Sequence, residues 1–288
     1  MDSLVGWLVA QCESAEHREL WSAQGRVELR AVASGDRVMV SACAMRKGLR
    51  LPVPPRCILS EDVVRASAVG RLLGALDKYT LFAMFLLQQR ALNARSFWAA
   101  YMGVLPREFR FHPITFVSRM ASEPALQAAL QGEPLLLRAL QSQDERLRSE
   151  YRQAVSLLTP AALGRDAELA AAFGAGAPSY DDFLWGSFLV ISRAFDMQEP
   201  KMMVMLPFAD SMNHDSRVPT VQWRPKLPKG FFVVTILRDL AAGTELTADY
   251  HGAGARRGID DLKQYVMYGF VESDAFRNVV QAAALPPP

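Results

Sequence analysis

The residues best suited to chemistry stand in four short stretches in the second half of the chain. These are Ile191 to Phe195, Leu206 to His214, Gly243 to Tyr250 and Tyr268 to Ser273, which together span 83 residues. Arg193 carries a fork of donors that suits a carboxylate ligand. A tyrosine offers an apolar ring as a wall and a hydroxyl at its end. We therefore treat the four stretches as one candidate site, against the alternative that Arg193 forms only a salt bridge at a helix end.

Other kinds of site find little support in the sequence. Asp210 and His214 are four residues apart and could share a metal ion. Neither an HExxH pattern nor a third ligand accompanies them, so we expect no metal site and a structural role for this pair. No GxSxG elbow is present, which leaves nucleophilic hydrolysis unsupported. The Gly-Ala-Gly sequences at 174–176 and 252–254 lack the spacing of phosphate-binding loops, and we interpret them as plain turns.

The elements that must position the four stretches follow from local periodicity. Residues 3 to 20 have apolar spacing compatible with a helix, and Gly25 to Ser41 alternates around Ser34-Gly35-Asp36, which predicts a hairpin. From Ala66 to about Ala172, alanine and leucine are interleaved with regular charges, which predicts a large helical block. Further on, the pattern predicts a helix and two strands, at Asp181 to Phe195, Phe231 to Leu237 and Glu245 to Tyr250. Alternating βαβ folds do not place β segments around such an insert, so we predict an α+β protein.

Composition limits the partners and the compartment. The chain has 288 residues, 50% of them hydrophobic, and 32 basic against 30 acidic residues, for a net charge of +2. It can bury a core, but it has no global field that would attract nucleic acid or an anionic membrane. Cys12, Cys43 and Cys57 match no disulfide or metal spacing and indicate free thiols in a reducing compartment. With no long apolar run, we expect no membrane partner and an intracellular location, cytoplasmic or nuclear, or organellar if a transit peptide has been removed.

With the helical insert upstream, the four stretches resemble the SET-domain methyltransferases of the Rubisco large-subunit methyltransferase type. In that family the pattern reads SRAF, then PxxDxxNH, then GxEL with a strand ending in tyrosine, then YGFV. Here the matching residues are Ser192 to Phe195, Pro207 to His214, Gly243 to Tyr250 and Tyr268 to Val271. The N-terminal half is also consistent, and the family's insert is matched by Trp98, Tyr101, Leu105-Pro106 and Pro113. The resemblance covers roughly residues 1 to 275.

The resemblance implies a fold, a cofactor and a set of residue roles. The fold would be the SET β-fold of short sheets with a large helical insert, and the cofactor would be S-adenosylmethionine. The residues implied to bind the cofactor are Gln24, Gly25, Arg193, Asn213, His214, Tyr250 and Phe270. Those implied to line the acceptor pocket are Ser192, Asp210 and Tyr268. Two alternatives stay open, because Gln24-Gly25 would also suit an ordinary hairpin turn and Asp210 a structural hydrogen bond.

Methyl transfer sets its own demands on such a site. It is an in-line displacement, so a lysine acceptor must arrive as a neutral amine with a free lone pair. The site therefore needs a dry, narrow channel with polar groups that hold the amine and the methyl group in line. The resemblance implies that Tyr250 is the catalytic tyrosine and that Tyr268 lines the channel.

Three departures from the family pattern carry expectations of their own. Ala23 replaces the first glycine of a GxG turn, and alanine would be strained there if the position needs a positive φ. Tyr250 is followed by His251 before Gly252, where the family more often has tyrosine directly before glycine. Only 18 residues follow Phe270, and they end in three prolines. We therefore expect the family's C-terminal substrate-binding lobe to be absent.

From these observations we predict an N-terminal SET segment at 1–65, a helical insert at 66–175, a C-terminal SET segment at 176–275 and a tail at 276–288. The predicted function is S-adenosylmethionine-dependent protein-lysine N-methylation of a non-histone protein. Two alternatives stay open: a protein-histidine N-methyltransferase of the same family, and a catalytically weak SET scaffold that acts as a binding module. The expected partner is a protein substrate, with no nucleic acid, and the oligomeric state is left open.

Overall fold

A computed structural model describes residues 2–24, 26–31, 37–107, 109, 111–198, 201–226, 231–250, 260–271 and 273–284. The chain divides into two compact units, each made of separate stretches of sequence. The first unit comprises residues 1–60, 100–104 and 193–257, and the second comprises residues 61–99, 105–192 and 258–288. The division differs in detail from the predicted domain boundaries, because residues 258–288 cluster with the helices.

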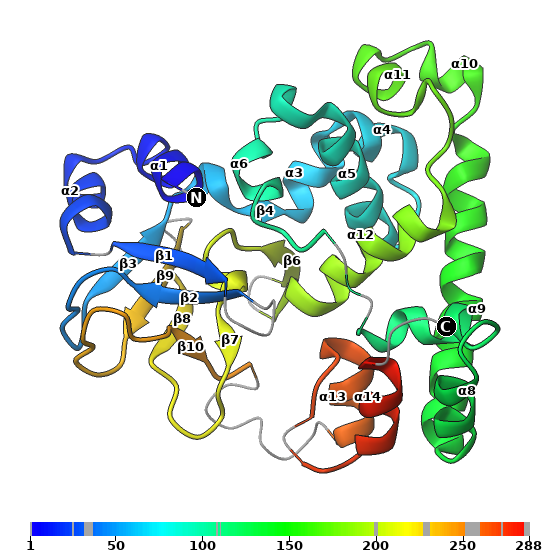
Figure 1. The fold of residues 1–288 in the computed structure, drawn as a ribbon. Coiled ribbons are helices and arrows are strands. Elements are labelled where there is room, and N and C mark those ends of the chain that lie inside the picture. Colours follow the sequence, from blue (N-terminus) through cyan, green and yellow to red (C-terminus); the bar gives the residue numbers. More distant parts are fainter. Residues whose placement is uncertain are drawn as a thin grey trace. The chain divides into compact units, whose positions relative to one another are not determined.

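The predicted N-terminal hairpin is present in the first unit. Strand β1 (Val27–Ala31) pairs antiparallel with β2 (Arg37–Ser41), with Val27 opposite Ser41 and Ala31 opposite Arg37 (Figure 1). The predicted Ser34-Gly35-Asp36 turn lies outside the described residues. Met39 and Val40 point to opposite faces of the second strand and are both buried, so this end of the strand is covered on both sides.

A five-stranded sheet carries two of the four candidate stretches. Its order is β3 (Arg50–Val53), β9 (Phe231–Ile236), β8 (Val221–Lys226), β10 (Thr247–Ala248) and β7 (Asn213–His214). β10 runs parallel to both of its neighbours, with Ala248 opposite His214 on one side and Val221 on the other. The sheet therefore places Asn213-His214 beside the strand that leads into Tyr250.

A three-stranded sheet leads into the Pro207 to His214 stretch. β6 (Lys201–Met205) lies between β4 (Leu59–Ser60) and β5 (Phe195–Gln198), and it is antiparallel to both. Its last three residues, Met203, Val204 and Met205, are fully buried. The chain then forms a short 3₁₀ turn, η5 (Ala209–Ser211). The buried end of β6 fixes where this turn begins.

The expected N-terminal helix is divided in two. The structure has α1 (Asp2–Ala10) and α2 (Ala15–Glu19), followed by one π-helical turn, η1 (Leu20–Gln24). Ser14 starts α2, because its side chain accepts a hydrogen bond of 3.0 Å from the backbone of His17. A capping serine inside an otherwise helical pattern is the physical reason for the break.

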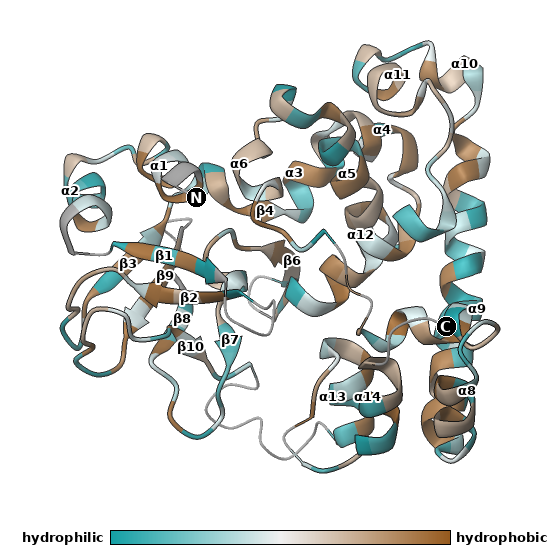
Figure 2. Cartoon of the chain, in the orientation of Figure 1, coloured by the Kyte–Doolittle hydropathy of each residue, from teal (hydrophilic) through white to brown (hydrophobic). Residues whose placement is uncertain are grey.

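The predicted helical block is confirmed, and it starts a few residues before Ala66. Its helices are α3 (Glu61–Ala66), α4 (Ala68–Leu73), α5 (Lys78–Leu92), α6 (Ala99–Met102), α7 (Phe116–Arg119), α8 (Pro124–Gln131), α9 (Pro134–Leu157), α10 (Pro160–Leu163) and α11 (Ala167–Phe173). The helix predicted next is α12 (Tyr180–Arg193). α9 carries hydrophobic and hydrophilic residues along its length (Figure 2), and it buries Leu136, Leu140 and Leu147.

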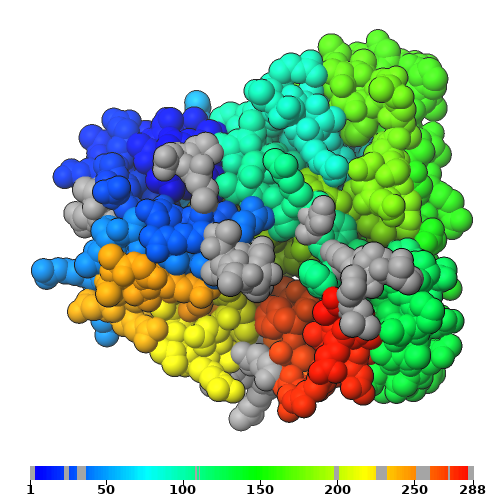
Figure 3. Space-filling model, in the orientation of Figure 1, coloured from blue at the N-terminus to red at the C-terminus, as the bar shows by residue number. Residues whose placement is uncertain are grey.

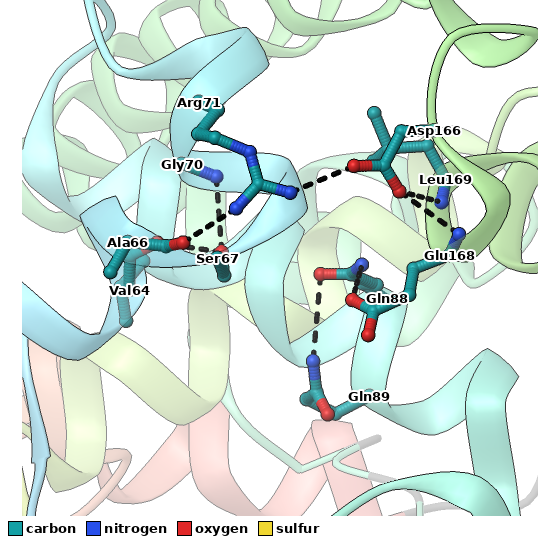
Figure 4. A network of polar contacts seen from close by, with 10 residues as sticks. All are labelled: Val64, Ala66, Ser67, Gly70, Arg71, Gln88, Gln89, Asp166, Glu168 and Leu169. Carbon is teal, nitrogen blue, oxygen red and sulfur yellow. Dashed lines mark hydrogen bonds and ion pairs between the residues drawn. The ribbon is translucent and has the colours of Figure 1, made fainter.

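Side-chain caps and polar contacts tie the block together (Figure 4). Asp166 caps α11 by accepting hydrogen bonds from the backbone of Glu168 and Leu169, at 2.9 and 3.2 Å. The same carboxylate contacts Arg71 of α4 at 2.8 Å. One residue therefore both starts α11 and links it to α4.

The last part of the chain contains two packed helices, the second of which lies where we expected a tail. α13 (Asp261–Tyr268) and α14 (Arg277–Ala284) contribute Tyr265, Val279 and Ala283 to a buried apolar cluster with leucines of α8 and α9. In Figure 3 the red C-terminal residues lie against the green residues of that region. Val279 and Ala283 are one turn apart and share a helix face. Burial of that apolar face stabilises α14 as a helix. The final prolines lie outside the described residues.

Candidate active site

Arg193 stands at the last position of α12, where the chain enters the first unit. Its Nη1 donates a hydrogen bond of 2.6 Å to the main-chain carbonyl of Asp210. Its Nε is buried and has no hydrogen-bond acceptor within the described part of the chain. A buried N–H without an acceptor is costly. A ligand carboxylate that binds this guanidinium is the kind of group that would supply one.

Asp210 is buried, with 7% of its surface exposed. The hydroxyl of Tyr101 donates to its Oδ2, and Ser211 Oγ donates to its Oδ1 at 3.3 Å. Burial raises the pKa of Asp210 to about 6, although Arg193 and the donated hydrogen bonds act in the opposite direction. These contacts favour the structural interpretation of Asp210 over a place at a pocket edge.

Phe208, just before this turn, has a backbone conformation that is rare for a side chain of its size. Its φ is 83° and its ψ is −59°, while the side chain is fully buried. The ring packs edge-on against Trp21 at 4.8 Å, and Trp21 Nε1 donates to the carbonyl of Pro52 at 2.8 Å. The packing holds a strained turn directly beside Asp210.

The Asn-His pair joins two of the candidate stretches. Asn213 Nδ2 donates a hydrogen bond of 2.8 Å to Glu245 Oε1, within the parallel pairing of β7 and β10. The glutamate of the GxEL stretch therefore holds the asparagine of the NH stretch. The sequence analysis did not single out Glu245, although its place in the GxEL motif was a signal.

Tyr250 follows β10 and is linked to both sides of that pair. Its hydroxyl donates to the carbonyl of Met212 at 2.6 Å, and its backbone N–H donates to His214 Nδ1 at 3.0 Å. Because Nδ1 accepts, the neutral His214 ring carries its proton on Nε2. The phenol proton is donated to the Met212 carbonyl, so the phenol oxygen can act as a hydrogen-bond acceptor toward another group.

Two predicted cofactor residues lie at or beyond the limit of the description. Gly25 is outside the described residues, and of Gln24 only the backbone is described, in the turn η1. Ala23 lies in the same turn. A helical turn has right-handed backbone angles, which alanine adopts without strain. The substitution therefore does not carry the strain that a positive φ would impose.

Ser192, Tyr268 and Phe270 belong to the second unit. Ser192 Oγ donates to the carbonyl of Phe188, one turn back on α12, at 2.7 Å. Tyr268 ends α13, with its ring 6.0 Å from that of Phe270, and burial raises its pKa. Their positions relative to Tyr250 stay a prediction.

His112, which the sequence analysis did not identify, supports the turn between Tyr268 and Phe270. Its Nδ1 accepts from the backbone of Ile114 at 3.1 Å, so its Nε2 donates to the carbonyl of Met267 at 3.2 Å. Gly269 has φ 78°, and a Cβ atom there would lie 2.9 Å from His112 Cδ2. The imidazole therefore fixes the helix end that carries Tyr268.

The described residues contain neither a cluster of metal ligands nor a membrane-spanning helix. No group of three or more histidine, cysteine, aspartate or glutamate side chains is placed to hold a metal ion in these parts of the chain. In the same parts, no helix is both long and apolar enough to cross a bilayer.

No protein-family model matches the chain. It is 27% identical over 243 residues to the chloroplastic [fructose-bisphosphate aldolase]-lysine N-methyltransferase of Arabidopsis thaliana, across 81% of this chain and 45% of that protein. It is also 27% identical over 270 residues to the chloroplastic ribulose-1,5 bisphosphate carboxylase/oxygenase large subunit N-methyltransferase of Pisum sativum, across 89% and 50%. The chain spans about half the length of these relatives.

The solved structures that resemble the chain are also of lysine methyltransferases of this type. The SET domain of LSMT bound to lysine and AdoHcy matches with a TM-score of 0.69 and 25% identity, over 87% of this chain and 53% of that one. Rubisco LSMT bound to sinefungin and monomethyllysine matches with a TM-score of 0.70 and 23% identity, over 94% and 56%. The chain therefore has the SET-domain fold. Within that fold it is similar to the Rubisco large-subunit methyltransferases, which confirms the predicted resemblance.

Proposed function

We propose that the chain is an S-adenosylmethionine-dependent protein-lysine N-methyltransferase that acts on a non-histone protein. The observation that carries the proposal is the convergence of Arg193, Asn213, His214 and Tyr250 in one unit of SET fold. The names of the relatives state lysine N-methylation, and the solved neighbours were bound to lysine or monomethyllysine, which supports lysine over histidine as the acceptor.

The residues fit the cofactor in chemical type. S-adenosylmethionine, when bound, supplies a methyl group made electrophilic by its sulfonium. Arg193 would hold the carboxylate, with its guanidinium oriented by Asp210. The segment at Asn213 and His214 would face adenine, held against β10 by Glu245. We propose Gln24, Gly25 and Phe270 as further cofactor contacts, on the sequence match alone.

Tyr250 would act on the acceptor. Its hydroxyl oxygen and the Met212 carbonyl are joined by the 2.6 Å hydrogen bond and so form a fixed pair of oxygens. Such a pair can hold an amine in line with a methyl group, which lowers the barrier by orientation. On the sequence match alone, we propose Ser192 and Tyr268 as contacts of the acceptor, and we propose that Asp210 acts by holding Arg193.

A scaffold without activity is the competing interpretation. Ala23 and the expected absence of the C-terminal lobe favoured it, and the helical turn that holds Ala23 removes the first of these two arguments. The intracellular location stays a prediction. An organelle is one possible compartment, because the names of the relatives describe them as chloroplastic.

The test has two stages on the same protein. Calorimetry measures binding of S-adenosylmethionine and S-adenosylhomocysteine, with one site per chain as the expected result. Labelled cofactor is then incubated with cell-extract proteins and with short lysine peptides, and hydrolysates are analysed for methyllysine and methylhistidine. Methyllysine in a protein acceptor supports the proposal. Methylhistidine would show that the acceptor residue is histidine and not lysine. Cofactor binding without any transfer would favour the scaffold.

A further inference from the structure

Tyr101 is a fully buried residue that connects the helical insert to the candidate cofactor site. In sequence it lies inside the predicted insert, on the short helix α6. In the structure, residues 100–104 belong to the first unit, together with Arg193 and Asp210. Its phenol is 0% exposed, so its hydroxyl must find a protein partner.

That partner is Asp210, and the chain of contacts continues to Arg193. The Tyr101 hydroxyl donates to the Asp210 carboxylate, 109 residues away in sequence. The main-chain carbonyl of Asp210 then accepts from Arg193 Nη1 at 2.6 Å. Asp210 is therefore held by a phenol on one side while it holds a guanidinium on the other.

The charges make this arrangement sensitive to the phenol. Within the described residues, the titratable and charged groups that face Asp210 are Tyr101 from α6 and Arg193 from the end of α12. Burial raises the pKa of Asp210, while Arg193 and the Tyr101 hydrogen bond oppose that rise. Burial also raises the pKa of Tyr101 well above its usual range, so the phenol keeps its proton and acts as the donor.

We propose that Tyr101 is a positioning residue of the cofactor site: it holds the carboxylate of Asp210, the residue whose main-chain carbonyl and negative charge in turn hold the Arg193 guanidinium. The inference rests on the proposed function, in which Arg193 binds the carboxylate of the cofactor. Without the hydroxyl, Asp210 takes up a proton at a higher pH. The neutral carboxyl then no longer attracts the guanidinium, and Arg193 is held at Asp210 only by its hydrogen bond to the main-chain carbonyl.

Tyr101→Phe is the direct test, because it removes the hydroxyl and keeps the ring. Binding of S-adenosylhomocysteine is measured by calorimetry from about pH 5.5 to 8.5. We expect affinity at neutral pH to fall by roughly 3- to 10-fold, the size of one ordinary hydrogen bond, because the hydroxyl acts on Arg193 only through Asp210. We also expect the midpoint of the acidic loss of binding to move upward by about half a pH unit or more.

Tyr151→Phe is the matched control. The Tyr151 hydroxyl donates to the carbonyl of Pro178 at 3.0 Å in the second unit, so this change also removes one hydroxyl hydrogen bond from a partly buried tyrosine. It should leave both the affinity and the pH midpoint unchanged. If Tyr101 were merely structural, Tyr101→Phe would lower stability without moving the midpoint.

A second comparison covers the case in which Tyr101→Phe alone does not fold, because asparagine at position 210 leaves no buried carboxylate without its donor. Asp210→Asn removes the titrating group, so adding Tyr101→Phe to it should change affinity by less than about twofold. A further large loss in the double variant would overturn the inference, as would an unmoved midpoint in a folded Tyr101→Phe protein. If the unchanged chain binds no S-adenosylhomocysteine, the proposed function fails and the inference fails with it.

Discussion

Tyr250 and His214 are joined at two points: the backbone N–H of Tyr250 lies 3.0 Å from His214 Nδ1, and the two rings are 5.0 Å apart between centroids. The hydrogen bond sets the tautomer of the imidazole, and the ring contact limits how the phenol can turn. The residue expected to face adenine is therefore also the residue that orients the tyrosine proposed to be catalytic. In the proposed site, cofactor binding and catalysis share one piece of the structure.

Replacing Tyr250 by phenylalanine should separate chemistry from binding. The ring contact with His214 and the backbone hydrogen bond remain, while the hydroxyl that contacts Met212 is lost. We expect cofactor affinity within about twofold of the original and a methyl-transfer rate at least roughly tenfold lower, because the hydroxyl acts on the reacting geometry. Single-turnover rates with labelled cofactor measure the effect. Full turnover in the variant would remove Tyr250 from the catalytic role.

His214 offers a graded test of the same link. Asparagine can place its side-chain oxygen near the position of Nδ1 and accept the Tyr250 N–H, whereas alanine cannot. We expect His214→Asn to retain more methyl transfer than His214→Ala, with both weakened in cofactor affinity. Paired measurements of affinity and single-turnover rate decide between the outcomes. Equal rates in the two variants would show that the hydrogen bond to Tyr250 is unimportant.

Arg193→Ala should weaken both S-adenosylmethionine and S-adenosylhomocysteine by about 1.5–3 kcal/mol, the range for a charge-assisted hydrogen bond. The change also leaves the buried Asp210 without its cation. The double variant with Asp210→Asn is therefore the proper comparison, because it removes the uncompensated charge. Calorimetry gives the affinities, and an affinity unchanged by the loss of Arg193 would exclude it from the site.

The free energy of unfolding should depend on pH through two buried groups, Asp210 and His112, whose effects have opposite signs. Burial raises the pKa of Asp210 to about 6 from 3.8, so its contribution to the free energy of unfolding is full below pH 3.8 and is lost as pH rises through about 6. Burial lowers the pKa of His112 to about 4 from 6.5, so its contribution is full above pH 6.5 and is lost as pH falls through about 4. Each amounts to about 3 kcal/mol.

Urea unfolding at several pH values between about 4 and 6.5 separates the two groups. Asp210→Asn should leave a free energy of unfolding that rises with pH, and His112→Gln should leave one that falls. The gradients differ in sign, so neither variant can imitate the other. A pH slope unaltered by either change would contradict the assignment of that residue.

Gly269→Ala should destabilise the end of α13 for two separable reasons. The left-handed φ of 78° costs alanine about 1–2 kcal/mol, and the new Cβ would meet His112 Cδ2 at 2.9 Å. In a His112→Ala background only the first cost remains. We therefore expect a coupling of roughly 1 kcal/mol between the two sites in a double-mutant cycle of urea unfolding. Strict additivity would mean that the imidazole does not confine this turn.

The sequence predicted those elements whose signal is local. Periodicity over a few turns or residues is enough to predict the strands of the hairpin, the helical block and α12. β3 and β8 were missed because Pro52 and Pro225 weaken a strand pattern. The structure accommodates both prolines: β3 is an edge strand, and β10 pairs with β8 only at Val221, away from Pro225.

The candidate site was predictable to the extent that it lies in contiguous motifs. Arg193, Asn213, His214 and Tyr250 were found in this way and share one unit. Tyr101 and His112 were not assigned a role, because each acts through a residue more than 100 positions away, Asp210 at 109 and Met267 at 155. No local pattern records such a pairing. It becomes visible only in the folded chain.

The discontinuity of the first unit affects how the protein is made. Ser41, at the end of the N-terminal hairpin, donates its hydroxyl to the carbonyl of Thr244, 203 residues further on. At about 5–20 residues per second, a ribosome needs about 10–40 s to supply that partner. Until then, the early strands stay unpaired on one edge, and unpaired edges invite aggregation. Residues 105–192 lie in the second unit as one stretch, and their helices can form while synthesis continues. The nascent chain can therefore form a helical body well before all the stretches of its first unit have been synthesised.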